Sequence, residues 1–280
     1  MTTLTETTGR IAPPPSPETS AGFLTTTAQT ARRTLLQFAR TPQLLLMPPL
    51  LAGLFLLIFR YIFGGAIETG GPVTYVDFLV PGFLAQTVLW NGMNVPAGVA
   101  EDATSGVYDR LRSLPIPRAA VMTGRTFADT ALNAWGLAVT AALGFAVGFR
   151  THADLGAVIA ALGLMLVVIY VFSWFFVSVG LSAGNAQAAQ GMSTLIVVPL
   201  SFVSGAFVPI DSMPGWMQAF AANQPVTVII NAVRSLMLGG TDAAGVGHTT
   251  TYWVLLSLAW CAGILAVFAA ISVTRFGRMR

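Results

Sequence analysis

The side chains that could do chemistry concentrate between Glu101 and Arg125, where the sequence reads EDATSGVYDRLRSLPIPRAAVMTGR. Gly106 permits a bend, and the following VYDRLRSL is compatible with a short helix. Pro115 and Pro117 end that helix, because a proline cannot continue it. The spacing predicts a compact helix between two longer apolar segments, a form suited to contact with another protein.

This short helix would present two kinds of side chain. Val107 and Leu111 supply apolar groups, and Arg110 and Arg112 supply positive charge. One interpretation is that the helix fits a groove of another subunit and transmits a rigid-body push to the segments on either side. The other is an ordinary solvated loop whose arginines only fix the orientation of the chain in a membrane. The residues by themselves favour neither.

A second polar group lies on one helical face. Arg125, Asp129 and Asn133 are spaced at i, i+4 and i+8. Ionisable residues inside a membrane are often functional. We interpret Arg125 and Asp129 instead as an ion pair at the level of the lipid headgroups that neutralises both charges.

Uncharged polar residues and glycines indicate helix packing. Gln86, Asn91 and Asn94 could line a substrate path. Polar side chains also hydrogen-bond helices together within membranes, and we favour that interpretation. Gly144 and Gly148 form a GxxxG pattern, which predicts close packing of the helix that carries them.

Composition excludes several classes of chemistry. All 14 Lys+Arg residues are arginine, so the chain lacks the lysine of a phosphate-binding nucleotide loop or a Schiff base. Cys261 is the one cysteine, which rules out an internal disulfide or a CxxC pair. His152 and His248 are too far apart for an HExxH zinc motif. We therefore expect no catalytic residue, no metal site and no cofactor bound by this chain.

The composition indicates a membrane protein. Only 9% of the 280 residues are charged and 55% are apolar, with a mean hydropathy of +0.73. A water-soluble fold has about 25% charged residues, so most of this surface must face lipid. The net charge of +3 does not indicate a nucleic-acid partner, because the arginines form no dense basic stripe.

The apolar stretches predict an all-α integral membrane protein with six transmembrane helices. A transmembrane helix needs about 20 mostly apolar residues to cross about 30 Å of hydrocarbon. The small, polar segment 181–191 divides a charge-free run at 155–210 into two parts. The six predicted spans are 41–59, 78–100, 130–149, the two parts of 155–210, and 251–274.

A seventh charge-free stretch, 212–233, is predicted not to cross. Pro214 and Pro225 interrupt it, and the longest uninterrupted helix of about 11 residues would reach only about 16 Å. We expect a helical hairpin that dips into the outer leaflet, packs against the fifth and sixth spans and holds Trp216 near the headgroups. The alternative is an exposed amphipathic outer loop.

Six spans place both termini on one side together with the 101–125 loop. That side then holds eleven of the 14 arginines, as the positive-inside rule requires of the cytoplasm. The prediction is a multi-pass protein of the bacterial plasma (inner) membrane with both termini cytoplasmic.

The N-terminal region divides in two. Residues 1–22 are rich in Thr, Pro and Ser and predict a disordered cytoplasmic tail, which leaves 23–280 as the transmembrane domain. Apolar residues then recur from Leu24 to Phe38 at spacings of three and four, and Pro42 ends the run. This pattern predicts an amphipathic helix on the inner membrane surface; the alternative is a frayed extension of the first span.

Two blocks of the chain resemble type-2 ABC exporter permeases, the family that includes the daunorubicin-resistance membrane subunits. The first is EDATSGVYDRLRSLPIPRAAVMTGR, from Glu101 to Arg125, and the second is SGAFVPIDSMPGWMQAFAANQPVTVIINAVR, from Ser204 to Arg234. The resemblance covers roughly 24–274. It implies that the first block is a cytoplasmic coupling helix that docks on a separate ATP-hydrolysing subunit through Glu101, Gly106, Arg110, Leu111, Arg112 and Pro115. It implies a re-entrant helical hairpin in the second block, with Ser204, Gly205, Pro209, Pro214, Trp216, Pro225 and Arg234.

The same resemblance implies the partners and the activity. ATP and Mg²⁺ would bind the partner subunit, and a second permease chain, identical or paralogous, would complete the pathway. The chain would then be the permease of an ATP-driven exporter. The apolar sequence and the lack of a charged residue at mid-membrane favour a hydrophobic or amphiphilic cargo, such as a drug, a lipid or a polyketide-like molecule.

Two alternatives come from other classes. An ion-coupled secondary transporter needs a titratable carboxylate at mid-membrane, whereas the eleven acidic residues fall at the ends of spans or in loops. An intramembrane hydrolase needs a nucleophile and a base, and no GxSxG pattern is present.

Overall fold

The computed structural model describes residues 22–63, 74–207, 210–240 and 246–278. The predicted tail at 1–22 lies almost wholly outside these ranges. The described part is helical and contains no strand. Three of its helices are long and apolar enough to cross a membrane: Leu45–Ile62, Leu155–Gly180 and Thr250–Gly277. The chain is therefore a multi-pass, all-helical membrane protein.

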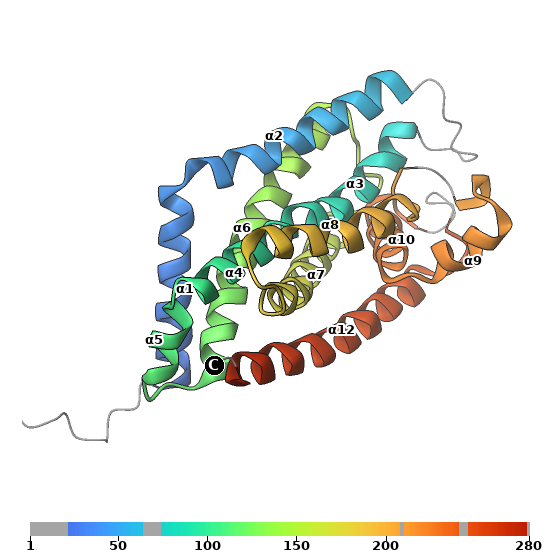
Figure 1. The fold of residues 1–280 in the computed structure, drawn as a ribbon. Coiled ribbons are helices and arrows are strands. Elements are labelled where there is room, and N and C mark those ends of the chain that lie inside the picture. Colours follow the sequence, from blue (N-terminus) through green and yellow to red (C-terminus); the bar gives the residue numbers. More distant parts are fainter. Residues whose placement is uncertain (1–21, 64–73, 208–209, 241–245, 279–280) are drawn as a thin grey trace, which may run out of the picture.

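The first two helices meet at a sharp bend. Helix α1 (Phe23–Arg40) ends before Thr41, and α2 (Pro42–Ile58) starts on a proline, which favours the first position of a helix because its missing N–H has no role there. A short π-helix, η1 (Phe59–Phe63), continues α2. Figure 1 shows α1 and α2 running in clearly different directions.

Helix α1 lies where the sequence predicts the interfacial helix. Thr26 and Thr34 are buried, and Gly124 of a later helix packs directly on the backbone at Thr27. Leu24 and Leu35, from the predicted apolar face, are exposed. The protein therefore covers the threonine face of α1 and leaves its apolar face free, as contact with a membrane surface requires. That contact itself stays a prediction.

The stretch predicted as the second span is two helices. Helix α3 (Tyr75–Gly92) ends before Met93 and Asn94, and α4 (Val95–Thr104) follows at once. Pro96 in the first turn of α4 explains the break, since it has no N–H for the carbonyl group four residues earlier. The segment 101–117, predicted to couple to an ATPase and named the coupling region for that prediction, continues with α5 (Val107–Ser113).

Three longer helices complete the central part. They are α6 (Arg118–Ala146), α7 (Leu155–Gly180) and α8 (Ala186–Phe202). Helix α6 begins twelve residues before the predicted span 130–149, so it carries charged side chains within the helix. The predicted break at 181–191 is confirmed but shorter, because the Asn185 side chain accepts a hydrogen bond from the Ala188 N–H (2.8 Å) and so starts α8 early.

The GxxxG interpretation is half right. Gly144 is buried in α6, and a Cβ there would lie 2.7 Å from Val80 of α3, so this glycine does permit close packing. Gly148 lies beyond the end of α6 with a φ of 110°. It therefore terminates the helix instead of packing against another.

The C-terminal part contains the predicted hairpin. A 3₁₀ turn, η2 (Ile210–Ser212), precedes α9 (Gly215–Asn223) and α10 (Pro225–Met237), and α12 (Thr250–Arg278) is the last helix. At 9 and 13 residues, α9 and α10 are too short to span a bilayer, since each residue adds about 1.5 Å. Figure 1 shows the C-terminal end of α12 beside the start of α6.

The number of crossings stays a prediction. Helices α3, α6 and α8 occupy the second, third and fifth predicted spans. They are shorter or less apolar than the three helices that are long and apolar enough to cross a membrane. Polar residues such as Asp77, Gln86 and Asn91 lower the hydropathy of α3, and α8 has only 17 residues.

Candidate functional site

The coupling region is a short helix that a glycine opens and prolines close. Gly106 has a φ of 74°, a left-handed conformation that favours glycine, and it immediately precedes α5. The helix ends at Ser113, Leu114 is extended, and α6 starts at Arg118. The sequence therefore predicts both the existence of this helix and its limits.

One face of α5 is attached to the rest of the protein. The ring of Tyr108 is buried and makes an edge contact with Phe276 near the end of α12, with the centroids 5.3 Å apart. Burial raises the pKa of the Tyr108 phenol above its usual range, so the group stays neutral. Val107 and Leu111 are half-buried against the same core. Their burial is only partial, and Leu111 also lines a groove on the surface, so contact of these two side chains with a partner stays a prediction.

The exposed residues of the coupling region are only partly those that the sequence analysis expected. Arg110 and Pro115 are exposed, as is Glu101 on α4. Leu114 is a large apolar side chain that the sequence analysis did not single out, and it is 53% exposed. The side chain of Arg112 lies outside what the structure describes.

Leu114 borders a groove of about 400 Å³ between the α5–α6 connection and the end of α12. Its lining is apolar except for one cation. The lining residues are Leu111, Leu114, Pro115, Ile116, Pro117, Arg118, Val121 and Phe276. This groove can take an apolar side chain of a partner.

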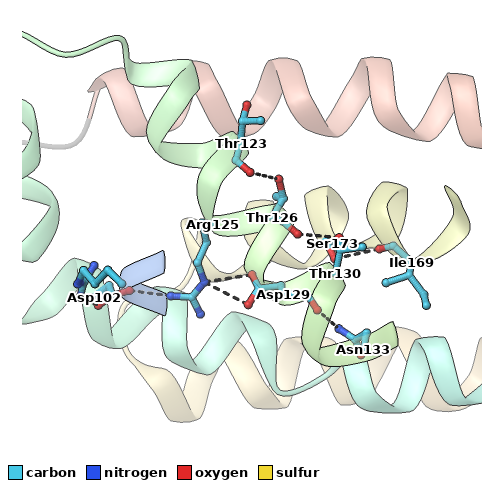
Figure 2. A network of polar contacts seen from close by, with 10 residues as sticks. Asp102, Thr123, Arg125, Thr126, Asp129, Thr130, Asn133, Ile169 and Ser173 are labelled. Atoms are coloured by element: carbon cyan, nitrogen blue, oxygen red, sulfur yellow. Dashed lines mark hydrogen bonds and ion pairs between the residues drawn. The ribbon is translucent and has the colours of Figure 1, made fainter. Parts of the chain in front are cut away.

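Behind the coupling region, a chain of ion pairs joins three helices. Asp102 at the end of α4 binds Arg125 of α6 (Oδ2 to Nη1, 2.7 Å) and Arg33 of α1 (Oδ1 to Nη2, 2.9 Å). Arg125 also binds Asp129 through its Nε, at 3.0 Å from Oδ2. Figure 2 shows the Arg125 guanidinium between the two carboxylates. The Nδ2 of Asn133 donates to the Asp129 carbonyl oxygen at 2.9 Å.

The Arg125–Asp129 pair predicted from the sequence is confirmed, but its surroundings differ. Both side chains are buried rather than set among headgroups. The sequence also missed Asp102, because no spacing rule connects a residue of one helix with residues on two others far along the chain. Gly98 makes room for the network, since a Cβ there would lie 2.9 Å from the Arg125 Nη2. The network thus holds α1, α4 and α6 together directly behind α5.

The hairpin of α9 and α10 has two unlike helices. Helix α9 is a surface helix: Pro214 precedes it and Trp216 is 77% exposed. Helix α10 starts at Pro225, and nearly all of it is buried. It packs on α3, α7 and α12, the helix of the sixth predicted span. Its contact with the fifth predicted span is at the end of that stretch, where Gly205 meets Thr227.

The remaining hairpin residues occupy the corner after α8. Ser204 and Gly205 are buried there, and the Thr227 hydroxyl of α10 accepts a hydrogen bond from the Gly205 N–H at 3.4 Å. Pro209 lies outside the described residues. Arg234 is 3% exposed in α10.

A second pocket of about 400 Å³ lies between α2, α3 and α8. Gln86, Asn91 and Asn94 line it, together with Trp90 and Gln190. Gln86 is buried, and neither atom of its amide group has a hydrogen-bond partner in the described part of the chain. The sequence interpretation of this glutamine as a helix-joining residue is therefore not supported; it belongs to a pocket.

Together the apolar helices define an integral membrane protein. Within the described residues, no group of His, Cys, Asp and Glu could hold a metal ion. The model of the ABC-2 type transporter family matches residues 26–238. The chain belongs to this family of membrane permeases.

Proteins similar in sequence to this chain are also named as permeases. The chain is 33% identical over 242 residues to the daunorubicin resistance ABC transporter permease protein DrrB1 of Streptomyces coeruleorubidus, covering 86% of this chain and 82% of that protein. It is 24% identical to the probable doxorubicin resistance permease DrrC of Mycobacterium tuberculosis, covering 88% and 86%. It is 27% identical to the inner membrane transport permease YadH of Escherichia coli K12, covering 75% and 81%.

Proposed function

We propose that this chain is the membrane subunit of an ATP-driven exporter and that a separate ATPase docks on the α5 region. The observation that carries the proposal is the two-sided construction of that region. Arg110 and Leu114 face outward, whereas the other side is fixed to α12 through Tyr108 and the preceding α4 is fixed to α1 and α6 through Asp102. A push on α5 would therefore move several helices together.

The energy source lies on the partner in this proposal. The chain has no lysine for a nucleotide phosphate loop, so ATP and Mg²⁺ would bind the ATPase and none would bind here. Both termini and the α5 region would be cytoplasmic, in line with the positive-inside distribution of the arginines.

The pocket between α2, α3 and α8 is the proposed start of the cargo path. Its lining contains no charged residue and mixes amides with Met47, Leu51 and Trp90, which suits a hydrophobic or amphiphilic molecule. The drug names of two relatives point the same way.

A second permease chain, identical or paralogous, would cover this pocket. Amides at membrane depth cannot face lipid without a large loss of hydrogen-bonding free energy. Met47, Leu51 and Asn94 of its lining are exposed, so the pocket is open to the surface of this chain, and a partner chain would close it into a passage.

The test is co-purification of an ABC ATPase with this permease from its native cells. Leu114→Asp would put an unpaired charge into an apolar contact, and we expect ATPase recovery to fall by about tenfold or more. Ser113→Asp, which adds the same charge at the neighbouring exposed position, is the matched control and should lose much less. Equal recovery with Leu114→Asp and with the native chain would place the interface elsewhere.

A further inference from the structure

Arg234 is a buried cation that the coupling region does not use. It lies near the end of α10 and is 3% exposed. Its Nε and Nη2 donate to the Phe78 carbonyl oxygen of α3, at 3.3 and 3.1 Å, and Nη2 also donates to the Gly205 carbonyl oxygen at 3.0 Å. The guanidinium carbon lies 3.7 Å from the centroid of the Phe78 ring.

No carboxylate faces this guanidinium among the residues that the structure describes. Burial of a cation without an anion is costly, and an apolar residue could fill the same space at lower cost. The bonds instead join three separate segments: α10, the start of α3, and the corner after α8. The planar fork of arginine is suited to this, because its donors can reach two carbonyl groups in fixed directions.

The neighbouring backbone is shaped around the guanidinium. A Cβ at Gly82 would lie 3.0 Å from the Arg234 Nη2 and 2.7 Å from the Ala206 carbonyl oxygen. Only a glycine at this position lets α3, Arg234 and the corner after α8 come so close. A second bond in the same place, from the Tyr75 hydroxyl to the Phe207 carbonyl oxygen (3.4 Å), also ties the corner to α3.

Helix α3 connects this cluster with the coupling region. Its outer end carries Phe78, and its other end continues through α4 to Asp102. We propose that Arg234 is a positioning residue that makes the outer hairpin follow α3, so that movement started at the coupling region opens and closes the outer end of the permease. This inference rests on the proposed function, since an ATPase must supply the movement.

The experiment uses the complex of the permease with its ATPase in lipid vesicles, in a Cys261→Ser background. An environment-sensitive fluorophore is attached to a cysteine at Asn94, between α3 and α4, or at Ala219, on α9; both positions are exposed. A non-hydrolysable ATP analogue is then added. With Arg234 present, we expect the fluorescence to change at both positions.

Arg234→Met should leave the fluorescence change at Asn94 in place and reduce the fluorescence change at Ala219 by about tenfold or more. This factor corresponds to the loss of one hydrogen bond to a charged group. Arg234→Lys keeps the charge but cannot bind both carbonyl groups with a fixed fork. Arg234→Lys should therefore also keep the response at Asn94 and lose the response at Ala219. It replaces the methionine variant in the test if that variant does not fold. Arg150→Met, at an exposed outer arginine, is the control and should leave both responses in place.

The outcomes separate the two proposals. An unchanged response at Ala219 in the folded Arg234 variants would overturn the inference, as would a native complex that responds at Asn94 only. A native complex that responds at neither position would contradict the proposed function, and the inference that rests on it would fall as well.

Discussion

At the residue scale, the ion network behind α5 shows how burial changes the value of a charge. Arg125 and Arg33 both bind Asp102, at nearly the same distance. The side chain of Arg125 is 7% exposed and that of Arg33 is 37% exposed. Water and salt screen the outer pair, whereas loss of Arg125 leaves the buried Asp129 without a cation and leaves Asp102 with only the more exposed Arg33.

The two arginines should therefore differ in their contribution to stability. Arg125→Met is expected to lower the free energy of unfolding by about 3–5 kcal/mol, because it breaks a buried network. Arg33→Met is expected to cost about 1 kcal/mol or less, as partly exposed pairs do. Thermal unfolding of the purified protein in detergent measures both. Equal losses for the two variants would mean that the network is not a buried unit.

At the element scale, the hairpin of α9 and α10 combines an exposed helix and a buried one. Trp216 and Phe220 of α9 are exposed apolar side chains, whereas Ile229 of α10 is 2% exposed. An exposed apolar face on a short helix suits the outer leaflet, and a buried helix belongs to the protein core.

This difference predicts the access of a thiol reagent. In the Cys261→Ser background, Ile229→Cys should react with a bulky, water-soluble reagent at least about a hundredfold more slowly than Asn223→Cys, since access to α10 requires local opening. Asn223 is the matched position because it is polar and exposed on the same hairpin. Similar rates would indicate a loosely packed surface loop.

Local sequence signals predicted these elements well, and contacts between elements poorly. Prolines and glycines mark the ends of α2, α5 and α10, because their effects act within a few residues. The bridging role of Asp102 could not be predicted, since its partners lie on α1 and α6. The exposure of Leu114 in place of Leu111 depends on how α5 packs on α12, which no periodicity in a helix of seven residues reveals.

At the scale of the whole molecule, arginine distribution predicts the orientation. Eleven of the 14 arginines fall on the side of the termini and the coupling region when six crossings are assumed. Ser113→Cys should then react only with reagent that reaches the cytoplasm, and His248→Cys should react from outside. Both positions are exposed. Labelling of both from the same side would exclude six crossings.

The central claim is that a separate ATPase acts on this permease at the α5 region. Site-specific photocrosslinking in cells tests it most directly, with a photoreactive amino acid at Leu114 and, as the control, at Trp216 of the outer hairpin, both of them exposed apolar positions. A crosslink is expected from position 114 to a protein with an ATP-binding phosphate loop, and none is expected from position 216. Failure to crosslink such a protein at 114, or equal crosslinking at both positions, would contradict this claim.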